Sequence, residues 1–245
     1  MKVGILAAGI TPEELQAQFG TYADMFVQLF NTAEYDFEYD IYDVREDVFP
    51  VGPEVCDSWI ITGSTSGVYE NQQWMQRLKT LIMEIHQQQK PLLGICFGHQ
   101  IIAEAFGGKV IKYNGEWGLG LQTYQLVSDS PYIPAEVAGK PFTINAVHQD
   151  QVVEKPASAE VFASSDFCQY AGLLYGDRIM TFQGHPEFTM EFEDALLQFR
   201  DGAGIPHEHA QKGLESLAAE NARIDSAEVS HWMANVLLQR PASRS

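Results

Sequence analysis

The sequence has few cysteines and no long apolar run. Its only cysteines are Cys56, Cys96 and Cys168, and none of them forms a Cys-x-x-Cys pair of the kind used by zinc or redox sites. An odd, sparse set argues against a disulfide framework and is typical of a reducing compartment, so we expect a cytoplasmic protein. We expect the short apolar segment Met1–Gly9 to be a buried strand rather than a secretory leader. No apolar stretch reaches the roughly 18 residues that a membrane-spanning helix needs.

Basic residues are also scarce. The chain has 15 Lys and Arg against 33 Asp and Glu, which gives a formal net charge of −18. Such a surface repels phosphate backbones and anionic membranes, so we expect neither a nucleic-acid nor a membrane partner. There is no Gly-Lys-Ser/Thr phosphate loop, no GxGxxG and no Cys/His cluster with metal spacing, so we expect no cofactor and no metal.

Over its first two-thirds, the sequence alternates short β-rich runs with helical patterns. This alternation predicts an α/β fold in which helices flank a mostly parallel open sheet, a flavodoxin-like or Rossmann-like three-layer arrangement. The strand-like runs are residues 3–7, 38–44, 59–62 and 91–95. The helical patterns cover residues 11–31, with Thr11 as the capping residue, 72–89 and 99–106.

The pattern changes after residue 108. Short alternating segments between 109 and 184 predict a small antiparallel edge, and the last of them, 179–182, is a further strand. The remaining chain has helical patterns, and the spacing of Phe188, Phe192 and Phe199 predicts that these rings are part of the core. We therefore predict a domain of residues 1–190 and a helical extension of residues 191–245 that packs on or near it.

Residues 94–98, Gly-Ile-Cys-Phe-Gly, lie between a predicted strand and a predicted helix. This is the arrangement of a nucleophile elbow with cysteine in place of serine. The sharp turn directs Cys96 into a cleft, and the helix N-terminus beneath it favours the thiolate. The backbone N–H of Phe97 would point at a developing oxyanion. Taken alone, the segment could also be a buried cysteine in a tight turn.

A base and an orienting acid are present in the segment His185-Pro186-Glu187, directly after a predicted strand. A cysteine nucleophile needs a base within hydrogen-bond reach, and that base needs an acceptor that orients it. Side chains two residues apart on a strand point the same way, so Glu187 can hold the imidazole of His185 in the required tautomer. Alone, the segment could be a polar surface loop, but together with the elbow it indicates a catalytic set.

A third segment, residues 61–67, reads Ile-Thr-Gly-Ser-Thr-Ser-Gly and follows a predicted strand. A loop rich in glycine and hydroxyl residues can offer free backbone N–H groups to an oxyanion. It could also bind a phosphate, although the usual phosphate-binding motifs are missing, or be a plain strand-to-helix turn. The segment indicates an oxyanion site only in combination with the other two segments.

In combination, the three segments resemble those of class I (triad-type) glutamine amidotransferases. Residues 94–100, followed by Ala-Phe-Gly-Gly at 105–108, resemble the family's nucleophile segment. Residues 185–187 resemble its His-Pro-Glu signature, and residues 62–64 resemble its oxyanion loop. The likeness runs from about residue 3 to residue 187, and the chain most resembles stand-alone domains similar to the amidotransferase part of GMP synthase.

The resemblance implies a mechanism. Cys96 would attack the γ-carbonyl of glutamine or of a γ-glutamyl compound, and His185, oriented by Glu187, would transfer the proton. A γ-glutamyl thioester would form, ammonia or an amine would leave, and water would release glutamate. The implied oxyanion site consists of the backbone N–H groups of Gly63, Ser64 and Phe97.

The resemblance also implies substrate contacts. Gln100 matches a position that helps to bind the α-amino-acid portion of glutamine. Residues 146–150, Ala-Val-His-Gln-Asp, lie where GMP-synthase-like domains carry Ser-His-Gly-Asp, and only His148 and Asp150 match. We expect His148 to contact the substrate, while the mismatch leaves the donor and any partner open.

The sequence leaves three alternative functions open. It could be a stand-alone hydrolase of glutamine or of γ-glutamyl compounds, such as a γ-glutamyl peptidase. It could be the ammonia-donating subunit of a separate synthase, or a non-catalytic binding protein on the same scaffold. No acceptor-side module is recognisable, and the intact cysteine, histidine and glutamate argue against the third function. An ammonia donor needs a face on which the synthase docks. The helical extension could cover that face, cap the site or form a homodimer interface, and its presence therefore favours the stand-alone hydrolase.

Overall fold

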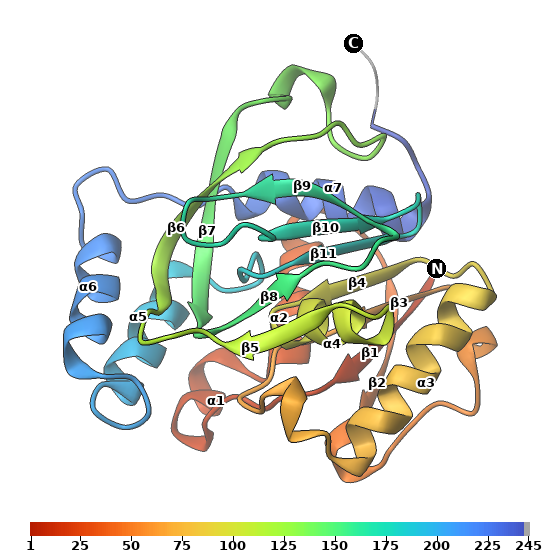
Figure 1. The fold of residues 1–245 in the computed structure, drawn as a ribbon, viewed down its shortest axis with the longest axis horizontal. Coiled ribbons are helices and arrows are strands. Elements are labelled where there is room, and N and C mark those ends of the chain that lie inside the picture. The colour runs from red at the N-terminus through yellow and green to blue at the C-terminus, as the bar shows by residue number, and fades with distance from the viewer. Residues whose placement is uncertain (243–245) are drawn as a thin grey trace.

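The computed structural model describes residues 1–242, in which a mixed sheet is covered by helices on both faces (Figure 1). Within these residues, nine strands form the main sheet in the order β2-β1-β3-β4-β11-β10-β9-β6-β7. The parallel part comprises β1 (Lys2–Ala7), β2 (Glu38–Asp43), β3 (Ser58–Ile61), β4 (Leu92–Ile95) and β11 (Ile179–Phe182). The predicted α/β architecture is therefore confirmed.

The antiparallel part is larger than a small edge. It continues the main sheet through β10 (Gly172–Tyr175), β9 (Ala159–Ser164), β6 (Gly118–Leu126) and β7 (Pro141–His148). A separate two-stranded sheet pairs β5 (Lys109–Lys112) with β8 (Asp150–Glu154). The edge strand β7 ends at His148. Near this end, Asn145 forms an isolated β-bridge with His185, which follows the parallel strand β11.

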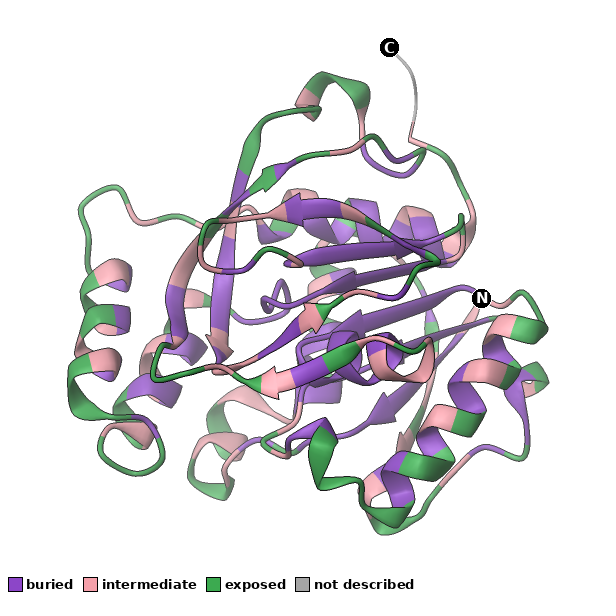
Figure 2. Cartoon of the chain, viewed as in Figure 1, coloured by how far each residue is buried: buried purple, intermediate pink, exposed green. Residues whose placement is uncertain are grey.

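The two faces of the parallel strands carry different helices. Alternate side chains of a strand point to opposite faces, so Val3 and Ile5 pack on one side and Leu6 on the other. α2 (Tyr22–Thr32) and α7 (Ser226–Leu238) cover the first face, and α3 (Gln73–Gln87) and α4 (Phe97–Ala105) cover the second. Figure 2 shows the sheet buried between these layers, with the outer face of α3 exposed. Among the described helices, none is long and apolar enough to cross a membrane.

The predicted single helix over residues 11–31 is wrong, because the chain forms α1 (Glu13–Phe19) and then α2. Gly20 adopts a positive φ of 75°, which ends α1. Thr21 then begins α2, where its hydroxyl and the side chain of Asp24 form a reciprocal capping box. The predicted cap at Thr11 is also wrong, because Pro12 precedes the first turn and makes no side-chain cap.

The C-terminal segment begins with α5 (Met190–Arg200) and α6 (His207–Leu217), which contact each other and the strand β6. Phe188 and Phe192 are buried, as predicted, and form an aromatic cluster with Tyr22. The prediction for Phe199 is wrong, because its side chain is 41% exposed. Phe199 has the predicted helical spacing from Phe192, but it lies in the last turn of α5, beyond that aromatic cluster.

Candidate active site

Cys96 lies at the turn between β4 and α4, and its backbone is strained. Its φ is 53° and its ψ is −103°, a conformation that non-glycine residues rarely adopt. The glycines on either side are required by close packing. A Cβ at Gly94 would lie 2.7 Å from the carbonyl oxygen of Gly98, and one at Gly98 would lie 2.4 Å from the carbonyl oxygen of Ile61. The elbow geometry that the sequence predicts is therefore present.

His185 follows β11, and three contacts fix its ring. Its backbone N–H donates to the carbonyl oxygen of Asn145 over 2.7 Å. Its Nδ1 lies 2.8 Å from Oε1 of Glu187, and both side chains are buried. The ring of Phe188 stacks on the imidazole, with 3.9 Å between the ring centroids and 7° between the planes. The position and the tautomer of the imidazole are therefore both constrained.

The electrostatic setting of His185 favours its charged form. Burial alone would lower the pKa of His185, but the negative charges of Glu187 and Cys96 outweigh burial and raise this pKa well above its usual value. The only hydrogen bond of the thiol among residues 1–242 is a long one, in which Sγ of Cys96 donates to the carbonyl oxygen of Val147 over 3.9 Å. Cys96 and the imidazole lie against the same residue, Gly63, and border one cavity, so an imidazolium there can be paired with a thiolate.

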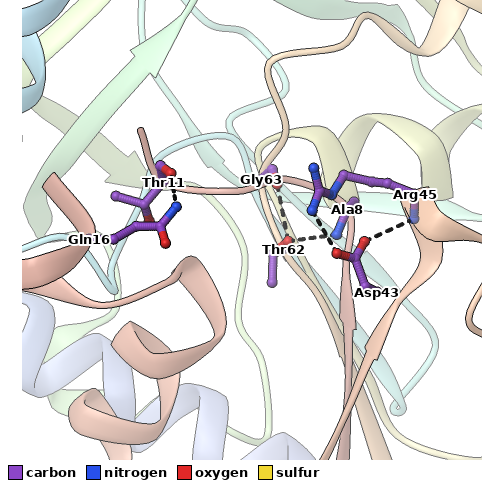
Figure 3. A network of polar contacts seen from close by, with 7 residues as sticks. All are labelled: Ala8, Thr11, Gln16, Asp43, Arg45, Thr62 and Gly63. Atoms are coloured by element: carbon purple, nitrogen blue, oxygen red, sulfur yellow. Dashed lines mark hydrogen bonds and ion pairs between the residues drawn. The ribbon is translucent and has the colours of Figure 1, made fainter. Parts of the chain in front are cut away.

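The loop after β3 lies against Cys96 and the imidazole of His185. Thr62 Oγ1 accepts from the N–H of Ala8 and donates to the carbonyl oxygen of Gly63, both over 3.0 Å (Figure 3). Since a trans peptide places its C=O and N–H on opposite sides, the N–H of Ser64 points away from Thr62. A Cβ at Gly63 would lie 2.8 Å from Cε1 of His185 and 3.7 Å from Cβ of Cys96. Glycine therefore allows the backbone to approach the reacting groups.

A cavity of about 330 Å³ opens at this point. It brings together most of the predicted site residues, namely Cys96, His185, Gly63, Ser64, Gln100 and His148. Glu187 does not border the cavity and lies behind His185. The side chain of Phe97 is buried against Trp74, so that only its backbone, at the first position of α4, is available to the site. Among residues 1–242, no group of three or more His, Cys, Asp or Glu could hold a metal ion.

Gln100 and His148 border the cavity, but protein groups already hold their side chains. Nε2 of Gln100 donates to the carbonyl oxygen of Asp150 over 3.0 Å and to Oε1 of Gln183 over 3.1 Å. Nδ1 of His148 lies 3.2 Å from the same Asp150 oxygen. Burial lowers the pKa of His148 to about 4, so the ring is neutral at pH 7. Both residues therefore help to fix the cavity wall.

Several residues around the cavity carry no signal in the sequence. They are charged or aromatic and come from five separate segments, and no fixed spacing relates them: Tyr22, Tyr69, Glu70, Lys112, Trp117 and Arg200. Arg200 is the last residue of α5, so the segment predicted as a helical extension contributes directly to the cavity wall. Only the folded chain shows this convergence.

Comparisons with known proteins agree with the motifs. Residues 31–202 match the sequence model of the family Glutamine amidotransferase class-I. Gamma-glutamyl peptidase 5 of Arabidopsis thaliana is 32% identical over 179 residues, which cover 71% of this chain and 70% of that protein. A glutamine-hydrolyzing GMP synthase subunit of Methanococcus maripaludis is 34% identical over 112 residues, 44% of this chain and 57% of that one. A solved glutamine amidotransferase from Thermotoga maritima has the same fold, with a TM-score of 0.73 and 18% identity over 97% of this chain and 98% of that one.

Proposed function

Since the chain belongs to the class I glutamine amidotransferase family, we propose that it hydrolyses the γ-amide bond of γ-glutamyl compounds through a thioester on Cys96. The observation that carries the proposal is the convergence of Cys96, on a strained elbow, and His185, which is hydrogen-bonded to Glu187, beside Gly63 at one cavity. A nucleophile, a base within reach and an orienting acid are the parts that acyl transfer through cysteine needs.

In the first half of the proposed reaction, the thiolate of Cys96 attacks the γ-carbonyl carbon and a C–S bond forms. The N–H groups of Ser64 or Gly63 and of Phe97 stabilise the negative charge that develops on the carbonyl oxygen. The imidazolium of His185 then gives its proton to the amide nitrogen, the C–N bond breaks and the amine leaves. The product is a γ-glutamyl thioester.

In the second half, water takes the place of the departed amine. Neutral His185 accepts a proton from the water as its oxygen attacks the thioester carbon. The C–S bond breaks, glutamate leaves, and the proton on His185 restores the imidazolium–thiolate pair. Throughout, Glu187 holds the Nδ1–H of the ring and stabilises its positive charge.

A stand-alone hydrolase has more support than an ammonia donor. The γ-glutamyl peptidase relative aligns with 71% of this chain, whereas the relative from GMP synthase aligns with 44%. The cavity also extends from Cys96 to Trp117 and Arg200, which gives room for a leaving group larger than ammonia. The relationship to the GMP synthase protein favours the ammonia donor as the second candidate.

The test is the release of glutamate by the purified chain from glutamine and from a panel of γ-glutamyl dipeptides. We expect turnover of dipeptides to exceed that of glutamine, and Cys96→Ala to reduce it at least about 10³-fold. Cys56→Ala is the matched control, because Cys56 is a buried cysteine outside the cavity. Turnover of glutamine alone, and only when a synthase is added, would support the ammonia donor and contradict the hydrolase.

A further inference from the structure

Arg200 borders the cavity and has no acidic partner among residues 1–242. This is unexpected in a chain with 33 acidic and 15 basic residues. The adjacent acid, Asp201, is already engaged, because its carboxylate lies 2.8 Å from Nδ1 of His207 and 3.0 Å from Nε2 of Gln211. The guanidinium of Arg200 therefore faces the cavity with its donors available.

A tight turn holds Arg200 in place. Its carbonyl oxygen accepts from the N–H of Ala203 over 2.9 Å and from that of Ile205 over 3.2 Å. Asp201 and Ile205 form an isolated β-bridge that closes the same turn. Gly204 lies beside the side chain, since a Cβ added there would be 3.4 Å from Nη1 of Arg200. The backbone that carries the guanidinium is thus fixed at the cavity wall.

Tyr22 is a second donor at the same place. Its side chain is 5% exposed, borders the cavity and makes no hydrogen bond within the described chain. Burial raises the pKa of the Tyr22 phenol, and the nearby charge of Arg200 opposes this rise only in part. The phenol therefore stays protonated and can donate. A guanidinium and a phenol, both without protein acceptors, make a site suited to a carboxylate.

These two donors reach the cavity from a different part of the fold than Gln100, since Tyr22 packs against Phe192 of the helix that carries Arg200. α4, which carries Gln100, contacts β5, β8 and the short helix η3 (Val68–Glu70). α5, which carries Arg200, contacts α1, α6, β6 and β7 instead. If Gln100 borders the glutamyl portion, as the family resemblance implies, then Arg200 is on the side of the departing amine. Apolar side chains accompany it there, Trp117 and Leu196 among them.

We propose that Arg200, with Tyr22, binds a carboxylate on the leaving group, so that the enzyme prefers γ-glutamyl amino acids or short peptides with a free C-terminal carboxylate. This inference rests on the proposed hydrolase function and names its substrate class. Arg200 determines specificity and does not touch the reacting atoms. A merely structural role is the alternative, because a cation at the end of α5 also stabilises the helix dipole.

The experiment compares γ-glutamyl-leucine with γ-glutamyl-leucinamide, which differ only in the carboxylate. Dissociation constants are measured by calorimetry on Cys96→Ala protein, and kcat/KM is measured on protein with an intact cysteine. We expect the carboxylate compound to be preferred about 10- to 100-fold, as is usual for a charge-assisted hydrogen bond. Arg200→Gln should reduce this ratio to about one, while Arg200→Lys retains part of it and Tyr22→Phe lowers it several-fold.

Arg77→Gln is the matched control, because this exposed arginine pairs with Asp47 on the surface and should leave the ratio as it is. Thermal melts of all variants show whether they are folded. Equal affinity for the two compounds, or a preference that survives in folded Arg200→Gln protein, would overturn the inference. The binding measurement is independent of catalysis. Carboxylate preference without any turnover would therefore retain the Arg200 site and reject the hydrolase. Turnover without carboxylate preference would retain the hydrolase and reject the Arg200 site.

Discussion

The imidazole of His185 lies flat against the ring of Phe188, with centroids 3.9 Å apart and planes 7° from parallel. Phe188 in turn meets Phe192 edge to face, with centroids 4.6 Å apart. The proposed base is thus held on one edge by a carboxylate and on its face by a buried aromatic cluster. Because general-base catalysis depends on orientation, this packing has consequences for rate as well as for stability.

Phe188→Leu should lower kcat about tenfold or more, since a tilt of the imidazole misplaces its proton-transferring nitrogen. It should also cost about 1 kcal/mol of folding free energy through lost buried contacts. Phe192→Leu is the control, because it removes a ring from the same cluster without touching His185. Steady-state kinetics and denaturant unfolding measure both effects. Equal losses of rate in the two variants would mean that the stacking has no specific role.

Glu187→Gln should reduce kcat by about 10²- to 10⁴-fold, the range for loss of the orienting acid in a catalytic triad. The charge of Glu187 raises the pKa of His185, so removing it should lower that pKa. The imidazolium is then lost at lower pH, and the alkaline limb of the rate profile should move to lower pH. Glu191→Gln, an exposed change in the first turn of α5, serves as control. An alkaline limb that stays in place in Glu187→Gln would contradict the pairing.

Gly63→Ala should abolish most activity while the protein remains folded. The added methyl would lie 2.8 Å from Cε1 of His185, closer than real Cβ contacts, so the loop or the imidazole must shift. Gly52→Ala is a fair comparison, because the three atoms nearest to its Cβ belong to the carboxylate at the end of the long side chain of Glu54. We expect kcat/KM to fall about 10²-fold for the first variant only. Retention of full activity in Gly63→Ala would argue that this loop does not pack against the catalytic groups.

Glu193 is a fully buried carboxyl whose Oε1 accepts from the N–H of Gly120 over 3.0 Å. Burial raises its pKa to about 8. The folded state therefore holds a proton that the unfolded chain releases at lower pH, so stability should fall as pH rises from about 5 to 8. Glu193→Gln keeps the acceptor without the charge and should flatten this fall. Urea unfolding of both proteins across that range is the measurement, and parallel curves would show that Glu193 does not titrate in this way.

Local sequence was enough to predict the parallel strands and the elbow. Buried strands such as β4 are short apolar runs, and a glycine-flanked cysteine between such a run and a helix admits few conformations. The break between α1 and α2 could not be predicted from the apolar spacing alone, because that spacing continues through Gly20. The break results from the positive φ of Gly20 and from the capping box of Thr21 and Asp24, which lie inside one apparent helical pattern.

The cavity beyond the triad could not be predicted, for a different reason. Arg200 and Tyr22 are separated by most of the chain, and only the packing of α5 against α1 and against Tyr22 itself brings them to one wall. Phe199 shows the same limit. Its helical spacing matches that of Phe192, yet its burial depends on which neighbours reach the last turns of α5.

Covalent labelling with a diazo-ketone analogue of glutamine tests directly whether Cys96 is the nucleophile. The diazo carbon next to the ketone takes a proton from the imidazolium of His185, the thiolate attacks this carbon, dinitrogen leaves and a thioether forms. Peptide mass spectrometry should find one adduct, on Cys96, and none on Cys56 or Cys168, which do not border the cavity. Labelling should be accompanied by loss of glutamate release. An unmodified Cys96 in protein that still hydrolyses γ-glutamyl compounds would show that Cys96 is not the nucleophile.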